Sequence, residues 1–261
     1  MTGREILSAI ERGCLDPEIR GIAAGYYASA AATALGNDHS RKPGTIRASD
    51  AGRCVRELWA DLHGKLDLPQ DASTTLSRFD IGTLYGAWLA AILKATLEKE
   101  DANIRVVLEV EVTRQGVTGH ADAIVCRCLP ALLNPQPEDF KPIYTAEFKS
   151  TYGKSNKKLP SEDRFYQVAQ VTHYALTYKS PMGGVITFAP AAWPAEDRFT
   201  AEDCDPAVYE LRTDLEFARL AAALLDEMPD GDPDKASWCS SCRFSACPAN
   251  KNPSVNVLEL S

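Results

Sequence analysis

The strongest constraint on the fold is a β-hairpin pattern in the middle of the chain. From Ile104 to Thr113, apolar residues at even positions alternate with mostly polar or charged residues at odd positions, which is typical of a strand with one buried face. Gln115-Gly116 supplies a turn, and the residues from Val117 to Cys126 predict the returning strand. The chain therefore has a sheet at its centre, around which the other elements must be arranged.

Helices and further strands are predicted on both sides of the hairpin. Before the hairpin, we expect helical residues 1–40, a short helix capped by Ser49 that ends near Leu62, and a helix with a capping-box signature at Ser77–Asp80 that ends near Lys99. After the hairpin, we expect a helix from Ser161 to Tyr178 and a helix that is capped by Asp205 and stops at Pro229. The other expected strands are Ile143–Lys149 and Val185–Ala189, and the expected loops are Leu66–Thr75 and Leu129–Pro142. This order predicts an α/β core with a mixed sheet (77–228), an N-terminal helical region (1–76) and a C-terminal cysteine-rich module (229–261), integrated into one domain.

Charge and cysteine content narrow the classes of function. The net charge is −8, from 28 Lys and Arg against 36 Asp and Glu, so a nucleic-acid partner would need a local basic groove rather than a global field. The longest apolar run, Ala87–Leu97, contains Lys94 and is too short for a membrane span. The first ten residues include Arg4 and Glu5 and do not resemble a signal peptide. Eight cysteines in a chain of this size therefore favour a reducing cytoplasm and a metal site over disulfides.

Two of the predicted central strands carry carboxylates and a lysine. Side chains alternate along a strand, so His120 and Asp122 share one face, and Glu147 and Lys149 share another. If these strands are neighbours, Asp122, Glu147 and Lys149 can converge. Two carboxylates and a lysine suit metal-assisted hydrolysis of a phosphodiester, because hard oxygen ligands bind Mg²⁺ or Mn²⁺, which acidifies a bound water. The ordinary alternative is a surface Glu–Lys pair beside a turn Asp.

A glutamine and a tyrosine on the following helix extend this constellation. Gln170 and Tyr174 are four residues apart and therefore share a helix face, which can lie along the site. Together these motifs resemble the RecB-like branch of the PD-(D/E)XK nuclease superfamily. The matching segments, in family order, are Gly119–Asp122 (GxxD), Glu147–Lys149 (ExK) and Gln170–Tyr174 (QxxxY).

The resemblance implies a restriction-endonuclease-like core and a role for each matching residue. Asp122 and Glu147 would bind the metal with help from the Phe148 carbonyl, Lys149 would be catalytic, and Gln170 and Tyr174 would support the site or bind DNA. Relatives often carry a metal-binding histidine in a GxxxH motif, but here the aligned text is Gly82-Thr-Leu-Tyr-Gly86. His120, Glu109 or Glu111 could replace that ligand, or the glycine could mean weaker metal binding or lost activity.

Three cysteines gather near the C-terminus. Cys239, Cys242 and Cys247 form a C-x₂-C-x₄-C run, whose thiolates can wrap one metal centre. Iron–sulfur members of the same family place one cysteine before the nuclease core and three after it. The resemblance therefore implies a [4Fe–4S] cluster on Cys54, Cys239, Cys242 and Cys247, joining the N-terminal helices to the tail. Zinc is the competing metal.

A basic segment follows the third predicted strand. Lys154, Lys157, Lys158 and Arg164 are interleaved with aromatic residues, a combination that can hold single-stranded DNA by phosphate contacts and stacking. A solvated loop is the ordinary alternative.

These observations lead to one main hypothesis and two alternatives. The expected function is a Mg²⁺- or Mn²⁺-dependent DNA nuclease, an exonuclease on single-stranded ends in recombination, repair, phage or CRISPR DNA processing, with a helicase, recombination or CRISPR-adaptation partner. The alternatives are a non-catalytic DNA-binding subunit that keeps the fold, and a zinc-stapled interaction module.

Overall fold

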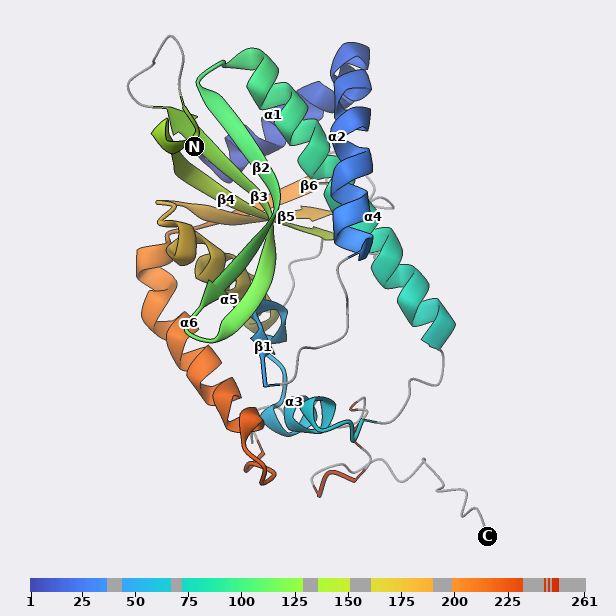
Figure 1. The fold of residues 1–261 in the computed structure, drawn as a ribbon, viewed down its shortest axis with the longest axis vertical. Helices are drawn as coiled ribbons and strands as arrows, with labels where there is room; N and C mark the ends of the chain where they lie inside the picture. The colour runs from blue at the N-terminus through green and yellow to red at the C-terminus, as the bar shows by residue number, and fades with distance from the viewer. Residues whose placement is uncertain are drawn as a thin grey trace.

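The computed structural model describes residues 1–36, 44–66, 72–128, 136–150, 161–189, 199–231, 242, 244 and 246–248, with backbone only for 34–36, 72–80, 137 and 161–164. A mixed sheet of six strands lies at its centre (Figure 1). The strands are β1 (Ile46–Arg47), β2 (Ile104–Arg114), β3 (Val117–Cys128), β4 (Phe140–Ser150), β5 (Gly183–Phe188) and β6 (Phe199–Cys204). Their order is β1-β3-β4-β5-β6, and β2 pairs with β3. The β1–β3 and β4–β5 pairs are parallel, and the others are antiparallel.

Helices cover both faces of the sheet. One face packs against α1 (Gly3–Leu15), α2 (Pro17–Gly36) and α4 (Ala72–Glu100), and its core includes Ile10, Leu93, Tyr144 and Phe148. The opposite face packs against α3 (Val55–Leu62), α5 (Ser161–Tyr178) and α6 (Pro206–Ala221). The predicted α/β core with a mixed sheet flanked by helices is confirmed, and no helix among the described residues is long and apolar enough to cross a membrane.

The hairpin predicted from the alternating pattern is present, and it is long enough to contribute buried residues to both hydrophobic cores. In Figure 1 its two green strands run from beside α1, α2 and α4 down to α5, α6 and β1. Accordingly, Val106 is buried in the first core, while Val112 is buried in the second. Both residues are at even positions, so a regular strand would point them to the same face of the sheet. Because they lie in different cores, the side chains of β2 change face between Val106 and Val112. Glu109, at the middle of this stretch, has a left-handed backbone with φ of 50°.

Several predicted boundaries need correction. The Ser77–Asp80 segment lies inside α4, which begins five residues earlier at Ala72, so it is not a capping box and the predicted loop to Thr75 is too long. The predicted helix from Ser49 is a 3-10 turn, Ala48–Asp50, followed by α3, whose N-cap is Cys54. β4 begins at Phe140 rather than Ile143.

The C-terminal part of the core shows one confirmed cap and one missed strand. Asp205 caps α6 by accepting a hydrogen bond from the Ala207 backbone N–H, with Pro206 at the first helical position. The helix ends at Ala221, followed by a 3-10 turn at Ala222–Leu224, which is short of the predicted end at Pro229. The strand β6 was not predicted.

Candidate metal and nucleic-acid site

The candidate site lies where two strands of the sheet separate. β2 pairs with β3 along nearly its whole length, so β1 and β4 must share the other edge of β3. β1 reaches only Thr118, and the pairing with β4 begins at Ala123. Within the described part of the chain, the segment from Gly119 to Asp122, which is the GxxD motif, therefore has no strand partner on that edge. Such a gap exposes backbone groups and places the motif's side chains beside the diverging end of β4.

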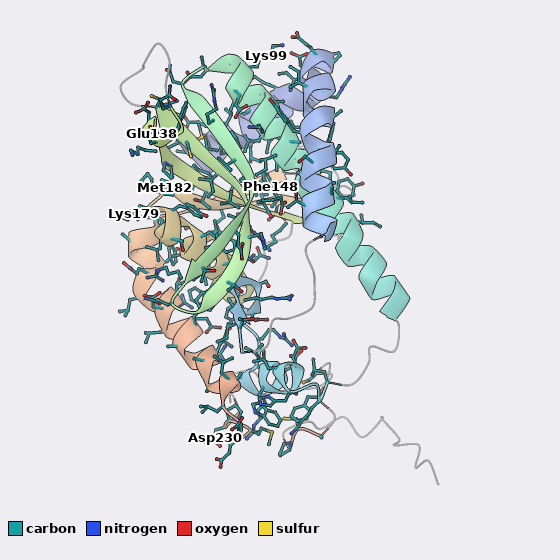
Figure 2. All side chains as sticks on the ribbon, viewed as in Figure 1. Lys99, Glu138, Phe148, Lys179, Met182 and Asp230 are labelled. Carbon is teal, nitrogen blue, oxygen red and sulfur yellow. The ribbon has the colours of Figure 1, made fainter. Side chains whose placement is uncertain are left out.

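Asp122 takes the place of the missing strand partner. Its Oδ2 accepts a hydrogen bond of 2.6 Å from the backbone N–H of Phe148 on β4. This contact fixes the carboxylate beside the ExK segment of β4. Figure 2 labels Phe148 at the centre of the molecule, where the strands cross in this view. Its ring packs against the helices of the first core, and Glu147 and Lys149 lie on the opposite face of β4.

Glu147, Lys149 and Gln170 form a closed hydrogen-bonded triangle. The Glu147 Oε1 accepts hydrogen bonds from Lys149 Nζ at 2.6 Å and from Gln170 Nε2 at 2.8 Å, and Lys149 Nζ also donates to Gln170 Oε1 at 3.0 Å. Glu147 is 3% exposed, yet its Oε2 has no hydrogen-bond partner among the residues that the structure describes. A buried carboxylate oxygen normally has a partner, so this atom is placed to receive a ligand.

Tyr174 reaches the unpaired edge of β3 through a space left by Gly119. Its hydroxyl accepts hydrogen bonds from Gln170 Nε2 at 3.1 Å and from the backbone N–H of His120. A Cβ at position 119 would lie 2.5 Å from that hydroxyl oxygen and 2.9 Å from Cε1. The glycine of the GxxD motif is therefore required by space, because any side chain there would displace Tyr174.

The electrostatics of the site favour a bound cation. Burial and the negative charges of Glu147 and Glu109 raise the pKa of Asp122 well above its ordinary value. Burial and Glu147 likewise raise the pKa of Glu109 to about 7. Burial would lower the pKa of Lys149, but Glu147 and Asp122 outweigh it and raise that pKa, so the ammonium stays charged at neutral pH. Lys149 thus faces the carboxyl groups of Glu147 and Asp122, and a divalent ion would further stabilise their negative charges.

The donor set fits Mg²⁺ or Mn²⁺, although the protein alone does not complete a metal cage. Among the described residues, no three histidine, cysteine or carboxylate side chains are arranged to hold a metal ion by themselves. Mg²⁺ commonly binds through one or two carboxylates and fills its other positions with water and substrate phosphate oxygens. Asp122 and the unpartnered oxygen of Glu147 meet that requirement.

The remaining predicted site residues are His120, the Gly86 position and the basic segment that follows β4. His120 is opposite Glu111 across the β2–β3 pair. Gly86, at the position where the motif that the sequence resembles carries a histidine, lies beside Phe148, and a Cβ there would make an ordinary contact at 3.7 Å. Lys154, Lys157 and Lys158 lie outside the described residues, and Arg164 is described only as backbone at the start of α5.

The cysteine end of the molecule brings together segments from far apart in the sequence. Cys54 is the N-cap residue of α3, and burial raises the pKa of Cys242. The neighbouring Trp59 ring lies 6.1 Å from that of Phe244. In Figure 1, α3 lies at the same end of the molecule as the last turn of α6 and the described C-terminal segments. Cys54, Cys242 and Cys247 thus belong to the same end of the molecule, although these three described cysteines do not form a metal-holding group by themselves. Cys239 lies outside the described residues.

Sequence reasoning did not find a cavity of about 680 Å³ between α2, α4 and β2. Tyr26, Lys94, Arg105 and Phe140 line it, and Glu109 lies at its wall. No sequence signal marks this space, because its wall residues come from α2, α4, β2, β3 and β4, and each element alone reads as an ordinary helix or strand.

Comparison with known proteins gives a fold relationship. No protein-family model matches the sequence, and no curated protein matches it. The crystal structure of SSO0001 is similar with a TM-score of 0.50 and 21% identity over 84% of this chain and 93% of that chain. At that identity the similarity is one of fold alone.

Two more distant similarities involve an alkaline exonuclease (LHK-Exo) from Laribacter hongkongensis. Its crystal structure has a TM-score of 0.35 at 12% identity, and its complex with dAMP has a TM-score of 0.35 at 14% identity. Each alignment covers 69% of this chain and 90% of that chain.

Proposed function

We propose that the chain is a divalent-metal-dependent nuclease that hydrolyses phosphodiester bonds at Asp122, Glu147 and Lys149. The observation that carries this proposal is the buried, unpartnered Oε2 of Glu147 beside Asp122, at the gap between β3 and β4. A hydrogen-bonded ion pair made only for stability would not leave one buried carboxylate oxygen unmatched. A divalent cation would satisfy this oxygen and the neighbouring carboxylate of Asp122, because both carry negative charge.

Each residue has a distinct task in the proposed reaction. Asp122 and Glu147, with the Phe148 carbonyl, would hold Mg²⁺ or Mn²⁺. When bound, the ion lowers the pKa of a water molecule and stabilises the charge that builds on the phosphate. The charged Lys149 contacts a phosphate oxygen or the attacking water. Water adds to phosphorus, the bond to the departing oxygen breaks, and that oxygen takes up a proton.

Gln170 and Tyr174 are positioning residues in this scheme. Gln170 bonds both Glu147 and Lys149, so it holds the metal ligand and the cation at a fixed separation. Tyr174 bonds Gln170 and the backbone at His120, so it ties that pair to the strand that carries Asp122. Preorganisation of this kind supports catalysis because the groups need not rearrange in the transition state.

The proposed substrate is DNA with a free single-stranded end. The basic segment that contains Lys154, Lys157, Lys158 and Arg164 directly follows β4, so it is close in sequence to Lys149. The net charge of −8 disfavours non-specific binding elsewhere on the surface. DNA processing of this kind fits work alongside a helicase, a recombination protein or a CRISPR-adaptation partner.

A [4Fe–4S] cluster on Cys54, Cys239, Cys242 and Cys247 is the second part of the proposal. The packing of Cys242 and Cys247 in the same core as α3, whose N-cap is Cys54, supports it, and a cluster there would tie the N-terminal region to the tail. Anaerobically purified protein is expected to be brown, with a broad visible absorption band and about four irons per chain. Colourless protein with stoichiometric zinc would contradict the cluster without touching the nuclease proposal.

The nuclease proposal is tested by degradation of end-labelled single-stranded DNA in Mg²⁺ or Mn²⁺. Wild type is expected to degrade it, and Glu147→Gln and Lys149→Met to lose the activity. Glu111→Gln, on an exposed position of β2, is the matched control and retains it. Activity that survives Glu147→Gln would rule out this site. Tight DNA binding without cleavage in any metal would instead favour a non-catalytic DNA-binding subunit, for which Gly86 in place of the family histidine is the supporting observation.

A further inference from the structure

The helix α6 carries a row of apolar side chains on its solvent side. Val208, Leu211 and Leu215 follow one another at spacings of three and four residues, and each is between 61% and 73% exposed. The exposed Ala218 and the half-buried Ala222, which is the C-cap residue, continue the row at the same spacings. We call these five residues the α6 stripe.

The α6 stripe is a second apolar face of the helix, because the first is already packed. Phe217 and Leu220 are buried in the core that also contains residues of α3, and Thr213 is buried on the same side. In Figure 1, α6 runs along the outer edge of the molecule. Single exposed apolar residues are ordinary on a protein surface, but a contiguous row of them marks an interaction surface.

The spacing of the α6 stripe indicates that its partner is a helix. Apolar residues that recur alternately three and four positions apart form the seam of a two-helix coiled coil, in which each side chain inserts between those of the facing helix. The facing helix needs the same spacing, and the α6 helix of a second copy has it by identity.

The order of large and small residues favours an antiparallel pair of such helices. The large side chains occupy the amino-terminal half of the stripe, and the two alanines occupy the carboxy-terminal half. In an antiparallel pair, Leu215 would lie opposite Ala218 of the other copy. Leu211 would likewise lie opposite Ala222, so each leucine meets an alanine. A parallel pair would place leucine on leucine and alanine on alanine, which leaves gaps at the alanines.

The charged residues of α6 do not oppose this contact, because they have partners in their own chain. These pairs are Glu210 and Asp214 with Arg114, Arg219 with Glu216, and Arg212 with the ring of Phe165. A second copy that packs against the stripe would therefore leave no charge buried and unpaired, which is the costly outcome at an interface.

We propose that two copies of the chain form a symmetric dimer through antiparallel packing of their α6 stripes. The two copies use the same surface, as in most protein dimers. An apolar patch of this kind covers about 300–600 Å², so the two copies would bury roughly 600–1,200 Å² in total, which is the size of a transient interface. The dissociation constant is therefore expected to be on the order of 10–100 µM.

The test is sedimentation equilibrium of the full-length, anaerobically purified protein from about 1 µM to about 500 µM. The average mass of wild type is expected to rise from one chain towards two. The double variant Leu211→Gln/Leu215→Gln is expected to stay at one chain throughout, with an unchanged thermal unfolding midpoint at about 1 µM, where wild type is also a monomer. The matched control is Ile22→Gln, an exposed apolar position on α2, which should dimerise like wild type.

Two results of this experiment would overturn the proposal. In the first, wild type remains a monomer at about 500 µM, and the stripe belongs to a different partner. In the second, the double variant dimerises as well as wild type, and the contact between copies lies elsewhere on the surface.

Changes of side-chain size test the antiparallel arrangement. Ala218→Leu would place a leucine against Leu215 of the other copy, and it is expected to weaken the dimer at least about tenfold. Exchange of the two residues, Leu215→Ala/Ala218→Leu, restores the match of large with small and should return the dissociation constant to within about threefold of wild type. A tighter dimer in Ala218→Leu, or an exchange variant that dimerises no better than Ala218→Leu, would overturn antiparallel packing.

Discussion

The most direct structural prediction concerns the contact between Gly119 and Tyr174. In Gly119→Ala the new Cβ would lie 2.5 Å from the Tyr174 hydroxyl oxygen, 2.9 Å from Cε1 and 3.1 Å from Cζ. The tyrosine is 2% exposed and has little room to retreat, so either the ring or strand β3 must shift. The site would then lose the bonds from Gln170 and His120 that hold the hydroxyl.

Two terms set the expected cost of that change. Overpacking a buried site by one methyl group costs about 1–3 kcal/mol, and leaving a buried hydrogen-bonding group unsatisfied costs about 1–3 kcal/mol. Gly119→Ala is therefore expected to lower the free energy of unfolding by roughly 2–5 kcal/mol. Tyr174→Phe removes the atom closest to the new Cβ. The double variant should therefore be more stable than the sum of the two single changes predicts, by about 1 kcal/mol or more.

Urea unfolding followed by tryptophan fluorescence measures the four proteins of this cycle. Gly21→Ala in α2 is the matched control, because a Cβ there meets nothing within 4 Å and should stabilise an exposed helical position by about 0.5–1 kcal/mol. The reasoning would be refuted if Gly119→Ala cost less than about 0.5 kcal/mol, or if the costs of the two changes added within about 0.5 kcal/mol.

Three further predictions concern charge and exposure. The folded-state pKa of Glu109, about 7, exceeds the ordinary value, so its contribution to stability is present at about pH 4 and is lost as the pH rises through 7. In metal-free protein, Glu109→Gln should therefore gain stability relative to wild type between pH 5 and pH 8, as measured by urea unfolding at each pH. The contribution of His173 to stability should change with pH in the opposite direction, because burial lowers the pKa of His173 to about 4. The stability of wild type relative to His173→Gln should therefore fall as the pH drops from about 6.5 to 4. Leu211 is 73% exposed, and Leu211→Gln should change the thermal unfolding midpoint by less than about 2 °C, because exposed substitutions cost little.

Local patterns predicted the elements whose formation depends on neighbours in sequence. The helix from Ser161 to Tyr178 and the hairpin of β2 and β3 follow directly from periodicity and turn residues. Strand β6, whose sequence is FTAEDC, alternates apolar and polar residues over only Phe199–Glu202, which is too short a signal to predict a strand, and it pairs with β5. Which distant segments pair in a sheet is difficult to predict from the sequence of either segment alone.

The α6 helix shows how a correct pattern can hide the orientation of a helix. Its apolar spacing predicted the helix, but Val208 and Leu211 are exposed, while Thr213 and Phe217 are buried. The face of α6 that contains Thr213 and Phe217 is the one that packs against the rest of the protein, including α5. The apolar pattern therefore identified the element without identifying its buried side.

The candidate site was predictable in its members but not in its geometry. The two-residue period of strands predicted that Glu147 and Lys149 share one face of their strand. The four-residue helical spacing predicted that Gln170 and Tyr174 share one face of their helix. These residues do meet. The separation of β3 from β4 and the left-handed backbone of Glu109 depend on which strands share an edge, which no local pattern specifies.

The central claim is that Asp122 and Glu147 bind a catalytic divalent ion beside a DNA phosphate. Anomalous diffraction from crystals of Lys149→Met grown anaerobically with Mn²⁺ and a short single-stranded oligonucleotide tests it most directly. We expect a manganese peak within about 2–2.5 Å of a carboxylate oxygen of each residue, with a phosphate of the oligonucleotide completing its coordination. Manganese or DNA bound elsewhere, with the Oε2 of Glu147 still without a ligand, would contradict the claim.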